Sequence, residues 1–206
     1  MAFSLPVHIA TVSISKGPNQ TVLYPQVLGM QNKEVERSIN QVITNENWGL
    51  IELQEGGMPT PVVDMVGQYE IKNNQREVLS LSLSNYTYHY HAAHGTTYIK
   101  SLTFGLDDGK LYSLGDLFMP GSDYVERISE LVQLQIEERD ISLVNGFTRI
   151  SPDQDFYIAD KALVIYYQLY EITAYVFGFP MFPISVYDLQ DIIDKDGPLG
   201  QMVINN

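Results

Sequence analysis

Residues 77–91 have the sequence EVLSLSLSNYTYHYH, in which bulky and small side chains alternate. Successive residues of a β-strand point to opposite faces of its sheet, so this period of two predicts a strand with one leucine face and one serine face. Beyond Asn85 the bulky residues are tyrosines at even positions. Either a β-bulge near Asn85 shifts the phase, or the tyrosines cover the second face. The two alternatives place His89 and His91 on different sides of the sheet.

Further strands are predicted on both sides of this segment. Residues 7–15 and 21–28 are rich in β-branched and aliphatic side chains and are separated by the turn-forming sequence Lys-Gly-Pro-Asn. Residues 97–106 alternate again and end at an Asp-Gly hairpin turn. Residues 156–158 form a short strand. The unbroken apolar run within 162–169 predicts a central strand covered on both faces.

Two segments have the apolar repeat of amphipathic helices. Asn32 is the predicted N-cap of the first, whose apolar side chains recur at i, i+4, i+7 and i+8. Trp48, near the end of this helix, is expected to be a packing anchor. Ser122 is the predicted cap of a second helix that runs to about Arg139, and residues 186–193 form a short closing helix. The chain is therefore predicted to have an α+β fold, with a mainly antiparallel sheet and two principal helices.

A segment with two glycines and two prolines, residues 54–61, cannot continue a helix or a strand. We place a domain boundary between this segment and Asn74. The prediction is a small N-terminal α+β part at residues 1–74 and a larger C-terminal α+β domain at residues 75–195. Residues 196–206 are predicted to be a frayed tail.

The composition excludes several classes of protein. The net charge of −13 repels nucleic acid and anionic lipid, whereas a cationic protein or a basic small molecule would be attracted. The chain has no cysteine, which removes disulfides, thiolate nucleophiles and cysteine-ligated metals. Neither a Gly-x-Ser-x-Gly elbow nor a phosphate-binding glycine loop occurs in it. We therefore predict no cofactor, and favour a binding protein over an enzyme.

The sequence predicts no insertion into a membrane. No stretch approaches the ~18 to 20 apolar residues that a membrane-spanning helix needs. Residues 1–15 alternate like a strand and lack the charged start and solid apolar run of a signal peptide. A cytoplasmic location follows, unless an anchor that precedes Met1 has been removed, in which case the location is extracytoplasmic.

Three histidines, His89, His91 and His94, form the one cluster with a metal-like composition. Two histidines at i and i+2 project from the same face of a strand, where they could share a divalent ion with a carboxylate. The third would reach this ion only if the following turn folds back. The alternative is that the imidazoles form ordinary hydrogen bonds. A metal-dependent hydrolase is thus the second functional hypothesis.

Aromatic residues provide the candidate binding surface. The tyrosine face of the predicted strand and the segment 175–183, which is rich in aromatic side chains, are expected to hold a ligand or partner. A carboxylate among tyrosines adds a polar candidate. The residues are Tyr86, Tyr88, Tyr90, Glu171, Tyr175, Phe177, Phe179 and Met181.

Several stretches resemble, in order, a bacterial family that includes the extracytoplasmic half of the RsiV anti-sigma factors, which bind lysozyme. The resemblance covers roughly residues 77–193 and implies a two-part α+β sensor whose partner is a protein or a cell-wall-related ligand. It implies no catalytic residue. Relatives usually carry a membrane helix or an export signal, which this chain does not show. The matching stretches are YHYHAAHG (88–95), LTFGLDDGK (102–110), LGDLF (114–118), FYIADKALVI (156–165) and YEITAYVFGFPMFPI (170–184).

Overall fold

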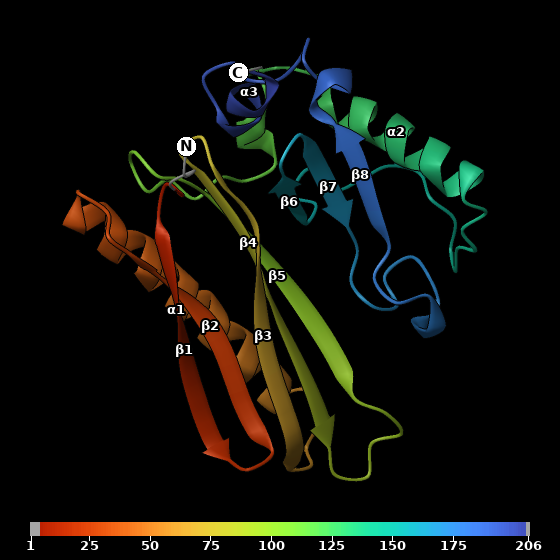
Figure 1. Cartoon of the computed structure of the whole chain (residues 1–206). Helices are drawn as coiled ribbons and strands as arrows, with labels where there is room; N and C mark the ends of the chain where they lie inside the picture. Colours follow the sequence, from red (N-terminus) through yellow and green to blue (C-terminus); the bar gives the residue numbers. More distant parts are fainter. Residues whose placement is uncertain (1–4, 205–206) are drawn as a thin grey trace. The chain divides into compact units, whose positions relative to one another are not determined.

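The computed structural model describes residues 5–204 and divides the chain into two compact units, one ending at Leu111 and the other beginning at Tyr112. The first unit contains a five-stranded sheet and the second a three-stranded sheet. Helices and strands are segregated within each unit, so the predicted α+β class is confirmed (Figure 1).

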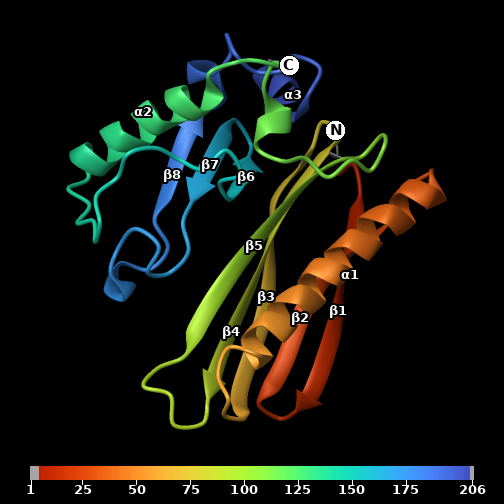
Figure 2. The same ribbon diagram turned by 180° about the vertical axis from the view of Figure 1, so that it is seen from behind.

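The first unit is a sheet with one long helix on one face (Figures 1 and 2). Its strands lie in the order β1-β2-β3-β4-β5. Neighbours are antiparallel except for β2 and β3, which are parallel because helix α1 carries the chain between them. The elements are β1 (His8–Gly17), β2 (Gln20–Leu28), α1 (Lys33–Glu55), β3 (Val62–Gln75), β4 (Val78–His89) and β5 (Thr96–Gly105).

The leucine face of β4 lies in the core of this unit. Leu79, Leu81 and Leu83 are fully buried together with Ile39 and Ile43 of α1. Burying side chains of this size contributes about 1.5–3 kcal/mol each, which makes this interface the main source of the unit's stability. The predicted alternation of β4 is therefore the pattern that attaches α1 to the sheet.

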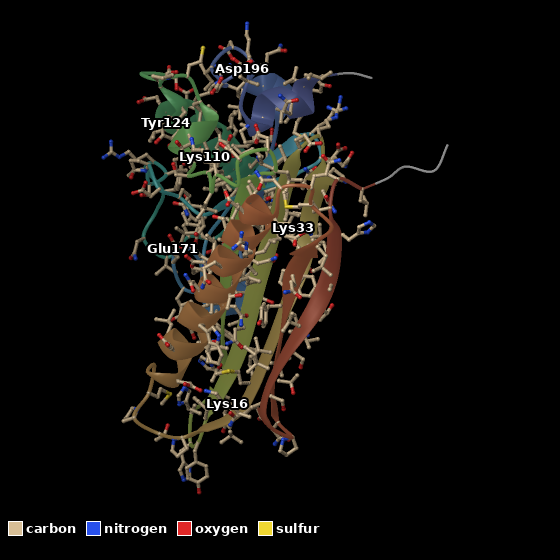
Figure 3. All side chains as sticks on the ribbon, turned by 90° about the vertical axis from the view of Figure 1, so that its left-hand side faces the viewer. Lys16, Lys33, Lys110, Tyr124, Glu171 and Asp196 are labelled. Atoms are coloured by element: carbon tan, nitrogen blue, oxygen red, sulfur yellow. The ribbon has the colours of Figure 1, made fainter. Side chains whose placement is uncertain are left out.

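The ends of α1 are held by side chains; Figure 3 labels Lys33, the first residue of the helix, and Lys16 of β1. Asn32 caps the first turn, because its side-chain oxygen accepts hydrogen bonds from the Glu34 and Val35 amides at 3.0 and 3.3 Å. Near the other end, Lys16 of β1 forms an ion pair with Glu55. Trp48 is 39% exposed, so the expectation that it is a packing anchor is wrong. The Lys16 ammonium instead lies 5.9 Å from the centre of the indole ring.

The second unit packs a helix against a small antiparallel sheet of strand order β6-β7-β8. Its central strand β7 corresponds to the apolar run of the sequence, and Leu163 and Ile165 are fully buried. The elements are the 3-10 turn η1 (Gly115–Leu117), α2 (Tyr124–Glu138), β6 (Phe156–Ala159), β7 (Ala162–Tyr166), η2 (Tyr175–Phe177), β8 (Met181–Ser185), η3 (Val186–Asp188) and α3 (Pro198–Val203).

The structure differs from the sequence predictions at three places. The compact units part after Leu111 and not near Asn74, because β3 and β4 pair along their whole length across that position. The closing helix expected at 186–193 is only the short turn η3. The segment 196–206, expected to fray, contains α3, where Leu199 and Met202 are buried.

Gly67→Ala is expected to lower the free energy of unfolding by about 1–3 kcal/mol, the usual cost of overpacking a core. A Cβ atom at this position of β3 would lie 2.3 Å from the Cγ1 atom of Val22, which fills the space above the glycine. Urea denaturation followed by circular dichroism measures the change.

Gly49→Ala is the matched control, because a Cβ there meets nothing within 4 Å. This position is inside α1, where replacing glycine by alanine stabilises a helix by about 0.5–1 kcal/mol. Equal effects of the two variants would contradict the close packing of Val22 on Gly67.

Candidate functional site

The tyrosines of β4 cover the face of the sheet opposite to α1. The pairing of β4 with both neighbouring strands runs through Asn85 without a shift, so no β-bulge lies there. Tyr86 is consequently in phase with the serines and is partly exposed, whereas Tyr88 is half-buried. Tyr90 follows the strand and is exposed. Of the two alternatives that the sequence left open, the second is confirmed.

Gly95, at the end of the Ala-His-Gly sequence, allows Tyr86 to occupy its position. A Cβ atom on Gly95 would lie 2.2 Å from the Tyr86 ring, so the backbone and the ring are in direct contact. Any side chain at this position would push the ring away. The glycine in this motif is thus explained by the close approach of an aromatic side chain.

The opposite face of β4 changes from apolar to polar along its length. After the leucines come Asn85, Thr87 and His89, all of which are buried. They face the second half of α1, which contributes the buried polar residues Asn47 and Gln54. Burying polar groups costs free energy of folding unless they form hydrogen bonds. We therefore treat this end of the core as the candidate functional site of the first unit.

His89 connects three parts of the first unit. Its Nε2 atom lies 2.7 Å from the carbonyl oxygen of Gln54 at the end of α1, and its Nδ1 atom lies 2.8 Å from the carbonyl oxygen of Thr60 in the following loop. Both ring nitrogens therefore face backbone carbonyls. Neither nitrogen has a lone pair directed at an open site.

The three histidines do not converge, which corrects the metal-site hypothesis. His91 is exposed, has a φ of 63° and contacts the ring of Tyr90. The Nδ1 atom of His94 lies 2.9 Å from the carbonyl oxygen of Gly95. Within residues 5–204, no group of three or more histidine, aspartate or glutamate side chains is arranged to hold a metal ion. The metal-dependent hydrolase hypothesis thereby loses the site on which it depended.

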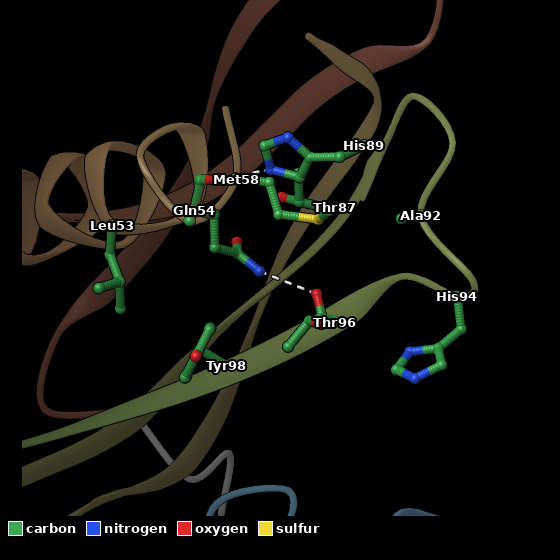
Figure 4. Close-up of a pocket in the computed structure, with 10 residues that line it drawn as sticks. Leu53, Gln54, Met58, Thr87, His89, Ala92, His94, Thr96 and Tyr98 are labelled. Carbon is green, nitrogen blue, oxygen red and sulfur yellow. Dashed lines mark hydrogen bonds between the residues drawn. The ribbon is translucent and has the colours of Figure 1, made fainter. Parts of the chain in front are cut away.

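A cavity of about 150 Å³ lies beside His89, between the end of α1, its following loop and the β4–β5 connection (Figure 4). The Gln54 side chain lies across it and donates a hydrogen bond from Nε2 to the Thr96 carbonyl oxygen at 2.8 Å. The lining residues are Leu53, Gln54, Gly57, Met58, Thr87, His89, Ala92, His94, Thr96 and Tyr98. Sequence reasoning missed this pocket, because its walls come from two stretches that are far apart in the chain, residues 53–58 and 87–98.

In the second unit, the loop between β7 and β8 exposes a group of apolar side chains. We call residues 170–177 the aromatic segment. Tyr170 and Tyr175 are exposed with ring centres 5.4 Å apart, and Phe177 is exposed beside them. Val176 is 93% exposed at the tip of the 3-10 turn η2. The predicted candidates Phe179 and Met181 are only partly exposed, and Met181 is the first residue of β8.

Glu171, also predicted from the sequence, is exposed and belongs to a polar cluster. Its carboxylate accepts a hydrogen bond from the Gln168 amide at 2.7 Å, and the Gln168 side chain donates to Asp155 at 2.9 Å. Burial raises the pKa of Glu171, and the charge of Asp155 adds to this effect, whereas the hydrogen bonds from Gln168 and Gln154 oppose it.

The Tyr167 hydroxyl lies buried near this cluster and has no hydrogen-bond partner. Burial raises the pKa of this tyrosine, and the negative charge of Glu171 raises it further. The hydroxyl therefore stays protonated. The exposed carboxylate of Glu171 thus lies near the buried Tyr167 hydroxyl, and Glu171 itself is part of the aromatic segment.

The comparisons with known proteins agree on one uncharacterised family. Residues 115–187 match the family described as "Protein of unknown function (DUF3298)". A DUF3298 family member from Bacteroides fragilis NCTC 9343 superposes with a TM-score of 0.71 at 13% identity, over 97% of this chain and 98% of the other. A DUF3298 family protein from Pseudomonas aeruginosa PAO1 gives a TM-score of 0.69 at 13% identity, with 99% of both chains covered.

These similarities establish the fold that the chain shares with DUF3298 proteins. No curated protein sequence matches the chain. These three matches do not name the RsiV anti-sigma factors, so that finer relationship stays a prediction. In the part of the chain that the structure describes, every helix is too short or too polar to cross a membrane.

His89→Leu is expected to lower the free energy of unfolding by about 1–3 kcal/mol, because the imidazole no longer donates a hydrogen bond to the backbone carbonyls that it faces. His91→Asn is the control on the exposed turn, because asparagine tolerates the φ of 63° there, and it should change stability by less than about 0.5 kcal/mol. Urea denaturation measures both variants. A similar, small effect of the two would show that His89 does not hold the loop to α1.

Glu171→Gln is expected to make stability less dependent on pH. Because the pKa of Glu171 is raised above 4.5 in the folded chain, the folded state binds more protons than the unfolded state. The contribution of this carboxyl to stability is therefore greatest in acid, and it is lost as the pH rises through the folded pKa.

The measurement is the melting temperature from about pH 4 to about pH 8, which should fall less steeply for the variant than for the native chain. Glu138→Gln, at the exposed end of α2, is the control. Identical profiles for the native chain and Glu171→Gln would contradict the assignment.

Proposed function

We propose that this chain is a non-enzymatic binding or sensor module that recognises a protein partner through the aromatic segment. The observation that most directly supports this proposal is the exposure of Val176. Its side chain is 93% exposed, and the neighbouring residues Tyr175 and Phe177 also expose their rings. Contiguous apolar side chains exposed to water mark interaction sites, and aromatic residues are enriched where proteins meet.

The backbone conformation on both sides of this segment keeps its side chains exposed. Tyr170 and Gly178, at its two ends, have φ values of 67° and 79°, so the chain turns sharply on either side of η2. Left-handed backbone is uncommon for a bulky residue such as tyrosine. These turns hold the side chains of η2 at the tip of a loop and keep them out of the core.

The net charge of the chain indicates the sign of the charge on the partner. With a net charge of −13, the protein attracts a cationic surface and repels an anionic one. Glu171, directly within the aromatic segment, adds a local carboxylate. A cationic protein that offers an apolar contact fits both features, and the resemblance to the RsiV anti-sigma factors suggests lysozyme as the first probe.

The tyrosines of β4 are a second proposed contact surface. Tyr86 and Tyr90 expose their rings on the first unit, and Tyr88 lies between them in sequence. They belong to a different compact unit from the aromatic segment. A surface that joins the two therefore remains a proposal. A cell-wall-related ligand is the alternative to a protein partner at either surface.

Val176→Ser is expected to weaken the binding of hen lysozyme about tenfold while leaving the melting temperature unchanged, because the side chain contributes to an interface and not to the core. Phe177→Ser should act in the same direction. Leu134→Ser is the control, since this leucine is exposed on α2 outside the aromatic segment. Biolayer interferometry with the immobilised full chain measures the affinities.

Cytochrome c, another basic protein, separates specific recognition from charge attraction. At about 150 mM salt, where exposed charges more than ~8 Å apart are screened, lysozyme should remain bound and cytochrome c should not. Soluble peptidoglycan fragments test the cell-wall alternative with the same variants. The proposal fails if both basic proteins bind equally and Val176→Ser behaves like Leu134→Ser.

A further inference from the structure

The cavity beside His89 contains two hydrogen-bonding groups that the protein does not use. The Oε1 atom of Gln54 and the Oγ1 atom of Thr87 are buried and have no hydrogen-bond partner within the protein. Both residues are only 3% exposed, and both line the cavity. An unpaired buried polar group costs about 1–3 kcal/mol, so two such residues in the lining of one cavity mark it as a candidate binding site.

The orientation of the Gln54 amide is determined by chemistry. The Thr96 carbonyl can only accept a hydrogen bond, so the nitrogen of the Gln54 side chain must face it, at 2.8 Å. The Oε1 atom is therefore left as a fixed acceptor on the side of the amide group that faces away from Thr96 (Figure 4). Thr87 contributes a hydroxyl, which can rotate to donate or to accept.

The cavity favours a neutral ligand. Its lining contains no lysine, arginine, aspartate or glutamate. The nitrogens of His89 already face the carbonyls of Gln54 and Thr60. A carboxylate or an ammonium group would thus lose its hydration without gaining an opposite charge, which is costly in a buried site.

The remaining walls are apolar, and the volume is small. Leu53, Met58, Ala92 and Tyr98 surround the polar groups. A cavity of about 150 Å³ holds a molecule of roughly the size of benzene. The ligand group is therefore a polar unit of a few atoms that carries a methyl or a similar apolar substituent.

We propose that this pocket binds the amide group of a ligand. The N–H of the amide donates to Gln54 Oε1, its carbonyl accepts from the Thr87 hydroxyl, and its methyl or alkyl substituent contacts Met58 and Leu53. An amide is neutral and offers one donor and one acceptor, which matches the two unused groups in kind. The site is in the first unit and is independent of the aromatic segment proposed above.

The test is a titration of the ¹⁵N-labelled full chain, followed by ¹H–¹⁵N correlation spectra, with N-methylacetamide as the probe. We expect saturable shifts of the Thr87, Ala92 and Thr96 signals in the millimolar range that is usual for fragments of about five heavy atoms. N,N-dimethylacetamide keeps the carbonyl but lacks the N–H, and should bind at least about tenfold more weakly.

Thr87→Val removes the hydroxyl without changing the shape of the side chain. It should weaken the binding of N-methylacetamide at least about fivefold and should leave the melting temperature unchanged or raised, because the hydroxyl is buried without a partner. Thr87→Ser retains the hydroxyl and should retain binding. A variant that loses binding while it keeps its melting temperature has not simply unfolded.

Two kinds of molecule carry such an amide, and two further probes distinguish them. N-acetylglucosamine represents acetylated sugars, and N-acetylalanine methylamide represents peptides. Stronger binding of either one than of N-methylacetamide supports the proposal and identifies the source of the amide. The proposal is overturned if N-methylacetamide causes no saturable shifts, if N,N-dimethylacetamide binds equally well, or if Thr87→Val binds as the native chain does.

Discussion

The packing of α1 on the leucine face of β4 is the interaction on which the first unit depends. Leu79, Leu81 and Leu83 meet the apolar stripe of the helix and are excluded from water. The same long helix carries the chain from β2 to β3, so the one parallel pair of the sheet exists because the helix is attached. The close fit of Val22 over Gly67 completes that parallel pair.

The continuous register of β4 has a functional consequence. Because no residue is inserted at Asn85, the face that begins with leucines continues as Asn85, Thr87 and His89. A fully apolar continuation would pack more favourably, since several of these polar atoms lack partners. Two of the residues with unpaired atoms, Gln54 and Thr87, line the cavity beside His89. That coincidence is the physical basis for assigning a ligand to the pocket.

Within the second unit, apolar side chains are distributed in two different ways. Strand β7 buries its aliphatic residues on both faces, as its unbroken apolar sequence predicts. The aromatic segment has a similar composition, yet Val176 is almost completely exposed. Composition therefore does not separate core from surface here. The turns at Tyr170 and Gly178 separate the exposed segment from the core, because they direct this segment away from the sheet.

The sequence by itself determined the local elements of this protein. The two-residue period of β4, the Asn32 cap of α1 and the apolar run of β7 follow from local geometry and were predicted correctly. The α+β class follows from them. The tyrosine and histidine candidates were found by residue type alone, and the sequence left the side of the sheet for the histidines open.

Only the tertiary structure decided where these side chains meet. His89 is held by carbonyls from two other segments, and the Gln54 and Thr87 side chains share a cavity although they are far apart in the chain. The division of the chain after Leu111 and the burial of α3 likewise depend on long-range contacts. Contacts between distant segments are set by the packing of whole elements, which a local pattern of residues does not encode.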